Sequence, residues 1–204
     1  MKLFKNNQTG RSMVEMLGVL AIIGVLSVGG IAGYSKAMFK YKINKTIQDI
    51  TSISQGIRTL CLDGGVKCNE APCFSGSIKS GCSLLKNLNL VPEDMWDGET
   101  DNLINPFGGK VDISFSSTYM YIEYYNLPHN VCAALAAVDW TTAASGVGEI
   151  FISNNVGKQA SAYSKEYAAK NNITLTRENS LPLKADIIAN SCGAEGSRIK
   201  ISFY

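Results

Sequence analysis

The sequence predicts an α+β protein in which one long, protruding N-terminal helix packs on an antiparallel β-sheet. Three observations lead to this prediction. No proline occurs between Met1 and Ala71, so no helix-breaking residue interrupts this stretch. From Val111 onward, several segments alternate apolar and polar residues, as strands with one buried face do. Helical patterns lie between those segments, and strands mixed with helices behind one long helix indicate the α+β class.

The long helix is predicted to run from Ser12 to Leu62, and its two halves differ. From Met13 to Gly33 the chain is apolar on all sides, and Glu15 is the only charged residue there. A helix needs about 20 apolar residues to cross a bilayer, so this half has the length of a membrane span. The whole helix would be roughly 75 Å long. A globule of the remaining size cannot cover that length, so we expect the first half to protrude.

Beyond Gly33 the helix is amphipathic, because apolar residues recur at helical spacing and predict one buried face. Asp49 and three other polar residues lie mostly off this face. Glycine favours the left-handed conformation that ends helices, so Asp63-Gly64-Gly65 is the predicted end. The predicted face consists of Ile43, Ile47, Ile50, Ser54, Ile57 and Cys61, and the other residues off it are Lys45, Gln48 and Gln55.

The remaining elements follow in order along the chain. Asn105-Pro106-Phe107-Gly108-Gly109 is a turn cluster. Asn130 is expected to cap an alanine-rich helix. The predicted strands are 111–115, 119–124, 148–152 and 199–203, and the predicted helices are 83–90, 131–138 and 161–170.

Charge and motif content exclude several functions. The net charge of +2 comes from Lys2 and Lys5, so a chain that begins at Arg11 is neutral and lacks the basic surface typical of nucleic-acid binding. No catalytic, phosphate-binding or dinucleotide-binding motif is present. His129 is the only histidine, and a lone histidine in a loop is more often structural or solvated than catalytic. We therefore predict no enzyme activity, cofactor or nucleic-acid partner.

The tyrosine-rich strand offers either a ligand platform or, as we favour, a sheet face packed on the long helix. Its tyrosines are Tyr119, Tyr121, Tyr124 and Tyr125.

Six cysteines lie beyond the apolar run, and an even number beside an export-type N-terminus predicts three disulfides in an oxidising compartment. The first four lie in one loop, without the C-x2-C spacing or nearby histidine of a zinc site, so no metal is predicted. Four cysteines allow three connectivities, and the sequence does not choose among them. The six are Cys61, Cys68, Cys73, Cys82, Cys132 and Cys192.

The N-terminal segment differs from an ordinary secretory signal, whose apolar core is shorter and is followed by its cleavage site. Here the natural cut lies before the apolar run, after Gly10, so the run would stay in the mature protein. A charged Glu15 is energetically costly in hydrocarbon, so an intramembrane carboxylate indicates a function. In one interpretation its side chain reaches the membrane interface or pairs with Arg11. In the other it meets a positive group of another subunit, such as the α-amino group that cleavage creates. Gly29 and Gly33 permit close helix packing, and together with Gly24 they soften the apolar half.

Gly10, Glu15 and the run Met16–Leu26, in this order after a short basic leader, resemble the N-terminus of a type IV prepilin. The resemblance implies cleavage after Gly10 by prepilin peptidase, N-methylation of Arg11, and an N-terminus that starts in the cytoplasm. Arg11 departs from the apolar residue that usually follows the cut. The resemblance also implies an inner-membrane precursor and a pilus assembly machinery that builds identical subunits into an extracellular filament.

The order of the turn at 105–109, the strands, a helix containing Cys132 and a late Cys192 resembles the type IVb pilins. In that subclass two such cysteines close the C-terminal region, so the resemblance implies a Cys132–Cys192 disulfide.

These observations predict a structural pilus subunit. Its parts would be the leader 1–10, the membrane or filament-core half 11–33, the amphipathic half 34–62 and the globular head 63–204. Two alternatives stay open at this point. One is a minor pilin or secretion-system pseudopilin, and the other is a membrane-anchored extracytoplasmic binding domain.

Overall fold

The computed structural model of the 204-residue chain describes residues 13–60, 85, 88–98, 102–115, 119–176, 178–193 and 196–204. The chain divides into two compact units, Met1–Tyr41 and Lys42–Tyr204. The described part of the first unit is helical, and the second unit contains a sheet and its own hydrophobic core. This arrangement confirms the predicted α+β class.

Helix α1 runs from Met13 to Arg58 without interruption, as the absence of proline predicts. Its carboxylate Glu15 lies in the first turn and its basic Arg58 in the last, which suits the helix dipole at both ends. The predicted stop at Asp63-Gly64-Gly65 lies outside the described residues. Of the predicted helix 83–90, residue 85 is helical, 88–90 are not, and the other four lie outside the described residues.

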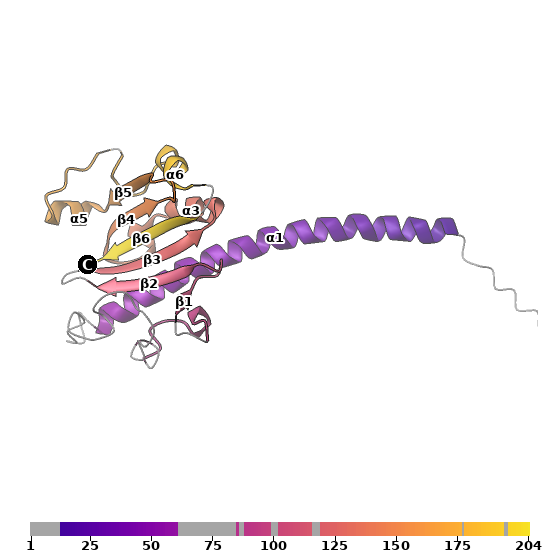
Figure 1. Cartoon of the computed structure of the whole chain (residues 1–204), viewed down its shortest axis with the longest axis horizontal. Coiled ribbons are helices and arrows are strands. Elements are labelled where there is room, and N and C mark those ends of the chain that lie inside the picture. Colours follow the sequence, from indigo (N-terminus) through magenta and orange to yellow (C-terminus); the bar gives the residue numbers. More distant parts are fainter. Residues whose placement is uncertain are drawn as a thin grey trace, which may run out of the picture. The chain divides into compact units, whose positions relative to one another are not determined.

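Six strands form one sheet in the order β1-β2-β3-β6-β4-β5, and every neighbouring pair is antiparallel (Figure 1). The C-terminal strand β6 lies between β3 and β4, so the last residues of the chain join the two halves of the sheet. The predicted antiparallel sheet is therefore confirmed. The strands are β1 (Leu103–Ile104), β2 (Lys110–Phe115), β3 (Met120–Leu127), β4 (Val147–Ser153), β5 (Gln159–Tyr163) and β6 (Ser197–Phe203).

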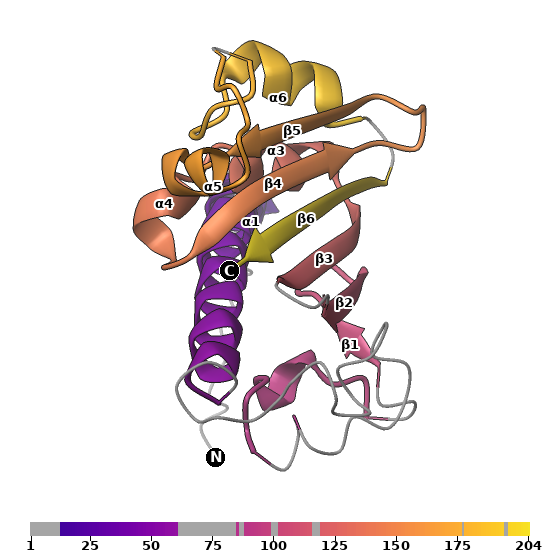
Figure 2. The ribbon, with the colours of Figure 1, turned by 90° about the vertical axis from the view of Figure 1, so that its left-hand side faces the viewer.

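Successive side chains of a strand point to opposite faces, and β3 shows which face is buried. Met120, Ile122 and Tyr124 are buried, whereas Tyr121 and Glu123 are only half-buried. The buried face packs with the part of α1 after Tyr41, which runs beside the sheet in Figure 2. Fully buried members of this core include Ile50, Ile53, Ile113, Ile122, Leu127, Leu135, Trp140, Ile150, Ile152 and Ile201.

The turn cluster between β1 and β2 forms as predicted. The Asn105 Oδ1 accepts hydrogen bonds from the backbone N–H groups of Phe107 (2.9 Å) and Gly109 (3.0 Å). A Cβ at Gly109 would lie 2.0 Å from the carbonyl oxygen of Tyr125, so only glycine allows strand β3 to approach this closely.

Short helices complete the second unit, and the sequence predicted two of their boundaries wrongly. Helix α3 begins at His129 after Pro128, so Asn130 lies in its first turn and does not cap it. The residues predicted to begin a helix at Ser161 instead belong to β5, because β4 offers them a strand to pair with. The helices are η2 (Glu93–Met95), α3 (His129–Ala136), α4 (Trp140–Ala143), α5 (Lys165–Lys170) and α6 (Ala185–Ser191).

Candidate functional site

The N-terminal part of α1 exposes an unbroken apolar surface. Every residue from Met13 to Ala37 is exposed, and none of the most apolar 18-residue window is buried. Among the described residues, α1 is the one helix long and apolar enough to cross a membrane. The large side chains on it are Met13, Val14, Met16, Leu17, Val19, Leu20, Ile22, Ile23, Val25, Leu26, Val28 and Ile31. A soluble protein rarely leaves so much contiguous apolar surface in water, so this surface indicates a site of contact with a membrane or with another protein.

Glu15 is the only charged residue of α1 before Lys36, and it is exposed at the start of the apolar surface. Gly10 and Arg11, the predicted cleavage and methylation residues, lie outside the described residues. Gly24, Gly29 and Gly33 have no described atom within 4 Å of an added Cβ. No contact within the described chain requires glycine at these three positions.

Near the C-terminus, a disulfide joins Cys132 of α3 to Cys192 at the end of α6, as the resemblance to type IVb pilins implied. The two Cα atoms are 5.7 Å apart, and both residues are buried. The bridge closes a loop with a sequence separation of 60 residues. It therefore ties together two short helices that α4, β4, β5 and α5 separate along the chain. Cys61, Cys68, Cys73 and Cys82 lie outside the described residues.

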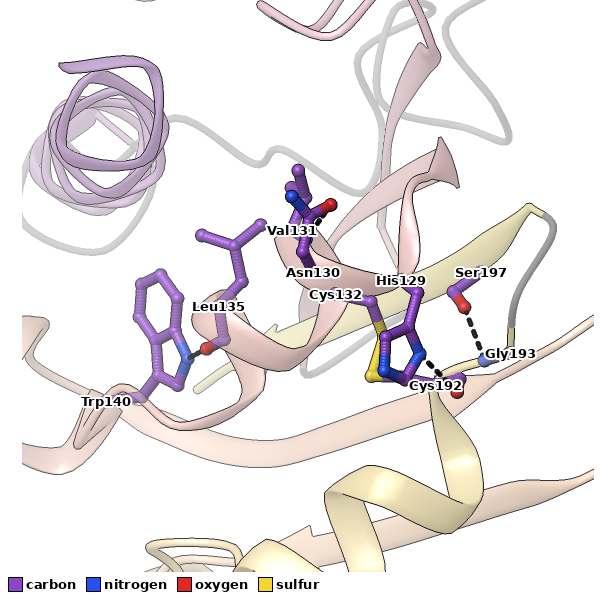
Figure 3. Close-up of a disulfide and its surroundings, with 9 residues drawn as sticks. All are labelled: His129, Asn130, Val131, Cys132, Leu135, Trp140, Cys192, Gly193 and Ser197. Carbon is purple, nitrogen blue, oxygen red and sulfur yellow. Dashed lines mark hydrogen bonds between the residues drawn. A yellow bond between two sulfur atoms is a disulfide. The ribbon is translucent and has the colours of Figure 1, made fainter. Parts of the chain in front are cut away.

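Two hydrogen bonds hold the segment around Cys192 (Figure 3). The Nδ1 of His129 is 2.9 Å from the Cys192 carbonyl oxygen. The backbone N–H of Gly193 donates to the Ser197 Oγ at 2.9 Å. His129 thus has a structural contact beside the disulfide. On the other side of α3, the indole N–H of the fully buried Trp140 donates to the Leu135 carbonyl at 2.9 Å.

A buried polar cluster lies under α1 in the second unit, and the sequence pattern did not predict it. Asp49 was expected mostly off the buried face, yet only 3% of it is exposed. Its Oδ1 accepts a hydrogen bond from the Lys45 ammonium at 2.7 Å, and Lys45 also contacts Asp94 at 3.0 Å. Lys45 lies one turn before Asp49, and this i, i+4 spacing of opposite charges was the available signal.

The charges in this cluster change the pKa values of its members. Burial raises the pKa of Asp49 above its ordinary value, although Lys45 opposes the shift. Burial opposes the charge of Lys45, but its hydrogen bonds to Asp49 and Asp94 outweigh this and raise its pKa. Burial, and then the Asp49 carboxylate, raise the pKa of the Tyr124 hydroxyl. Among the described residues, neither Asp49 Oδ2 nor the Tyr124 hydroxyl has a hydrogen-bond partner.

The opposite face of the sheet is half-exposed and alternates cations with aromatic rings. Arg198 lies 5.8 Å from the Tyr125 ring centroid and 5.4 Å from that of Phe151. Lys200 lies 5.1 Å from the ring of Tyr121 and 5.3 Å from that of Phe151. The tyrosines of β3 are thus divided: Tyr124 packs toward α1, while Tyr121 and Tyr125 face the cations. The expectation that these tyrosines form one face packed on the helix is wrong for Tyr121 and Tyr125, because neighbouring residues of a strand point to opposite sides.

Part of this face also carries a carboxylate. The Tyr125 hydroxyl donates a hydrogen bond to Glu123, and burial followed by this hydrogen bond raises the pKa of Tyr125 to about 12. The described residues contain no group of three or more His, Cys, Asp or Glu side chains that could hold a metal ion. The features with distinctive chemistry are therefore the exposed apolar helix and the disulfide-closed region.

A long N-terminal helix with an exposed apolar half, an antiparallel sheet and a C-terminal disulfide together define the pilin-like α+β architecture. Comparison with known families agrees: the chain belongs to the family described as PilS N terminal, which matches residues 40–181.

Two relatives extend this match to nearly the whole chain. Both are described as the major structural subunit of bundle-forming pilus, one from Escherichia coli O111:H- and one from Escherichia coli O127:H6 (strain E2348/69 / EPEC). Each is 23% identical over 204 residues, which covers 98% of this chain and 95% of the relative. These findings support a type IV pilin, which is a structural subunit and not an enzyme.

Proposed function

We propose that this chain is a type IVb pilin that is cut after Gly10 and assembled from the inner membrane into a helical, extracellular pilus. The observation that carries the proposal is the apolar half of α1, exposed from Met13 to Ala37 with a single carboxylate in its first turn. A membrane and a bundle of identical helices are the two environments that cover such a surface on all sides. The major pilus subunits among the relatives support the second environment.

In this proposal the hydrophobic helix is first held in the inner membrane and then transferred into the filament. Contacts between unlike surfaces of identical subunits do not close into a ring, so they generate open helical assemblies. Different sides of the apolar helix then pack on the apolar helices of neighbouring subunits. Residues 11–33 would form the filament core, 34–62 the amphipathic half of the helix, and 63–204 the head.

Glu15 has a specific role in this mechanism. Cleavage after Gly10 by prepilin peptidase creates a new α-amino group on Arg11, which is also the residue we expect to be N-methylated. An unpaired carboxylate in an apolar environment is costly. An incoming subunit that neutralises Glu15 with its own N-terminus is therefore favoured, and this pairing sets the stagger between neighbours.

The first experiment measures the mass of the mature chain from membranes and from sheared filaments. We expect a chain that begins at Arg11 and carries one added methyl group. An intact leader in both fractions would contradict the pilin mechanism and favour a membrane-anchored extracytoplasmic domain. A processed chain that is present only in trace amounts along filaments would favour a minor pilin or pseudopilin.

The second experiment replaces Glu15. Glu15→Ala should leave the protein in the inner membrane but abolish filaments, because an incoming subunit no longer gains from neutralising the charge. Glu178→Ala removes an exposed carboxylate of the second unit and serves as the matched control. Electron microscopy of both strains gives the result. Filaments of normal length and number in Glu15→Ala would remove the role assigned to this residue.

A further inference from the structure

A short stretch of α1 combines exposed lysines and tyrosines directly after the apolar segment. We call Tyr34, Lys36, Lys40 and Tyr41 the lysine–tyrosine girdle; all four are exposed in the first unit. Tyr34 is 67% exposed and Tyr41 60% exposed. Both rings are therefore accessible to a partner outside the described chain.

The girdle lies in a strongly positive part of the sequence. After Glu15 the next acidic residue is Asp49, and four lysines occur between them. Two of these have partners within the second unit, since Lys42 lies 5.7 Å from the Phe107 ring and Lys45 pairs with Asp49. For the other two, Lys36 and Lys40, the described residues provide no ion pair. These two cations are therefore available to an external anion.

The spacing of the girdle matches the headgroup layer of a bilayer. The segment Met13–Gly33 is roughly 30 Å long as a helix, which equals the thickness of the hydrocarbon core, about 30 Å. When this segment fills the core, Tyr34 lies at its boundary, and Lys36 and Lys40 follow roughly 4 and 10 Å beyond Gly33. The headgroup layer on each side is about 5–8 Å thick, and lysine side chains bend toward it along the helix.

The chemistry of the girdle identifies its partner. Tyrosine is enriched at the membrane–water interface because its ring is apolar and its hydroxyl polar. Lysines beside a membrane span attract anionic lipids. Lys36 and Lys40 are four residues apart and share one side of the helix, while Tyr34 and Tyr41 are seven apart and share another. The girdle therefore presents cations on one side of the helix and aromatic rings on another, both near the depth of the headgroup layer.

We propose that the lysine–tyrosine girdle binds the headgroups of anionic phospholipids in the membrane leaflet on the side of the head. This inference rests on the proposed function only in that α1 must span a membrane. The orientation makes the binding useful, because lysines on the outer side oppose the positive-inside tendency. Bound anionic headgroups offset that tendency and set the depth of the helix in the membrane before assembly.

The test uses the full chain reconstituted into vesicles of phosphatidylcholine and phosphatidylglycerol. Electron spin resonance measures the fraction of spin-labelled lipid that the protein immobilises, and so its selectivity for phosphatidylglycerol. We expect this selectivity to fall about twofold or more in K36Q/K40Q, because each basic residue near an anionic surface contributes up to about a fivefold preference. High salt should remove the same preference from the unaltered chain.

Two further variants make the result specific. K158Q/K165Q makes the same charge change at exposed lysines of the second unit and should keep the full selectivity. K2Q/K5Q isolates the contribution of the leader at the other end of the helix. Equal selectivity in K36Q/K40Q and in the unaltered chain would overturn the inference. A chain that immobilises no lipid in any variant would instead contradict the membrane-spanning helix of the proposed function.

Discussion

Asp49 and Tyr124 lie in the core of the second unit, close enough for the carboxylate to raise the pKa of the hydroxyl. Lys45 satisfies one carboxylate oxygen, while Asp49 Oδ2 and the Tyr124 hydroxyl have no hydrogen-bond partner among the described residues. A buried polar group without a partner costs about 1–3 kcal/mol. These two side chains therefore lower the stability of the core that they help to fill.

Replacing Tyr124 tests this cost directly. Tyr124→Phe keeps the ring and removes only the hydroxyl, so the free energy of unfolding should stay the same or rise by about 1 kcal/mol. The measurement is urea unfolding of the full chain in detergent, followed by tryptophan fluorescence. Tyr125→Phe is the matched control, because that hydroxyl donates to Glu123 and its loss should lower stability. A clear destabilisation by Tyr124→Phe would show that its hydroxyl is satisfied in solution.

The raised pKa of Asp49 makes stability depend on pH. Burial raises this pKa above its unfolded value, so between the two values the folded chain holds more protons than the unfolded chain. The proton that Asp49 binds therefore stabilises the folded chain. This stabilisation is complete below the unfolded pKa of about 3.9 and is lost as pH rises through the folded pKa.

The corresponding prediction compares Asp49→Asn with the unaltered chain. As pH falls from 7 toward 4, the unaltered chain should gain stability relative to Asp49→Asn, because only the former takes up this proton. Urea midpoints at several pH values measure the difference. Asp186→Asn removes an exposed carboxylate and should show no such trend. A constant difference between Asp49→Asn and the unaltered chain would contradict the raised pKa.

At the level of elements, the C-terminal region depends on one covalent link. Helices α3 and α6 are short, with 8 and 7 residues, and short helices are not stable alone. The Cys132–Cys192 disulfide and the contact of His129 with the Cys192 carbonyl hold them together. Strand β6 begins only a few residues later, so the same link positions the strand that joins the two halves of the sheet.

Removing this disulfide should be costly. A loop with a sequence separation of 60 residues gives about 4 kcal/mol on the chain-entropy model. C132S/C192S should therefore unfold at a clearly lower urea concentration than the unaltered chain. This pair of substitutions is preferable to a reducing agent, which would also act on the other four cysteines. An unchanged midpoint would show that packing alone holds α3 and α6.

On the scale of the whole molecule, the chain separates an apolar helix from a unit that has its own core. All core residues of the described chain lie at or beyond Ile43, and every described residue before Met38 is exposed. The apolar half of α1 therefore contributes no buried side chain to the described fold. In the proposed function this apolar surface is buried first in the membrane and then in the filament.

Truncation tests this separation. A chain that begins at Ser35 and is exported to an oxidising compartment should be soluble and unfold cooperatively, because it retains the whole core. Near-ultraviolet circular dichroism should match that of the full chain in detergent, because the fully buried Trp140 lies in the second unit, which the truncated chain retains. Aggregation or a gradual unfolding transition would show that the apolar half is needed for the head to fold.

The sequence alone predicted the long helix, the class of fold and most strands. These features depend on local patterns: proline is absent from the first 71 residues, apolar residues have helical spacing, and strands alternate. The Cys132–Cys192 pairing came from a resemblance to type IVb pilins, since spacing cannot select partners among six cysteines. Cleavage after Gly10 and the role of Glu15 also come from the sequence and remain predictions.

Tertiary structure alone decided three features. Ser161 was expected in a helix but lies in a strand, because pairing with β4 outweighs local propensity. Tyr124 is buried while Tyr125 faces Arg198, and only the packing of α1 on one side of the sheet determines which face is covered. Asp49 is buried despite its charge, because Lys45 from the preceding turn and the core around Tyr124 enclose it. Periodicity identifies which residues share a face, whereas the partner of that face depends on contacts between residues far apart in the chain.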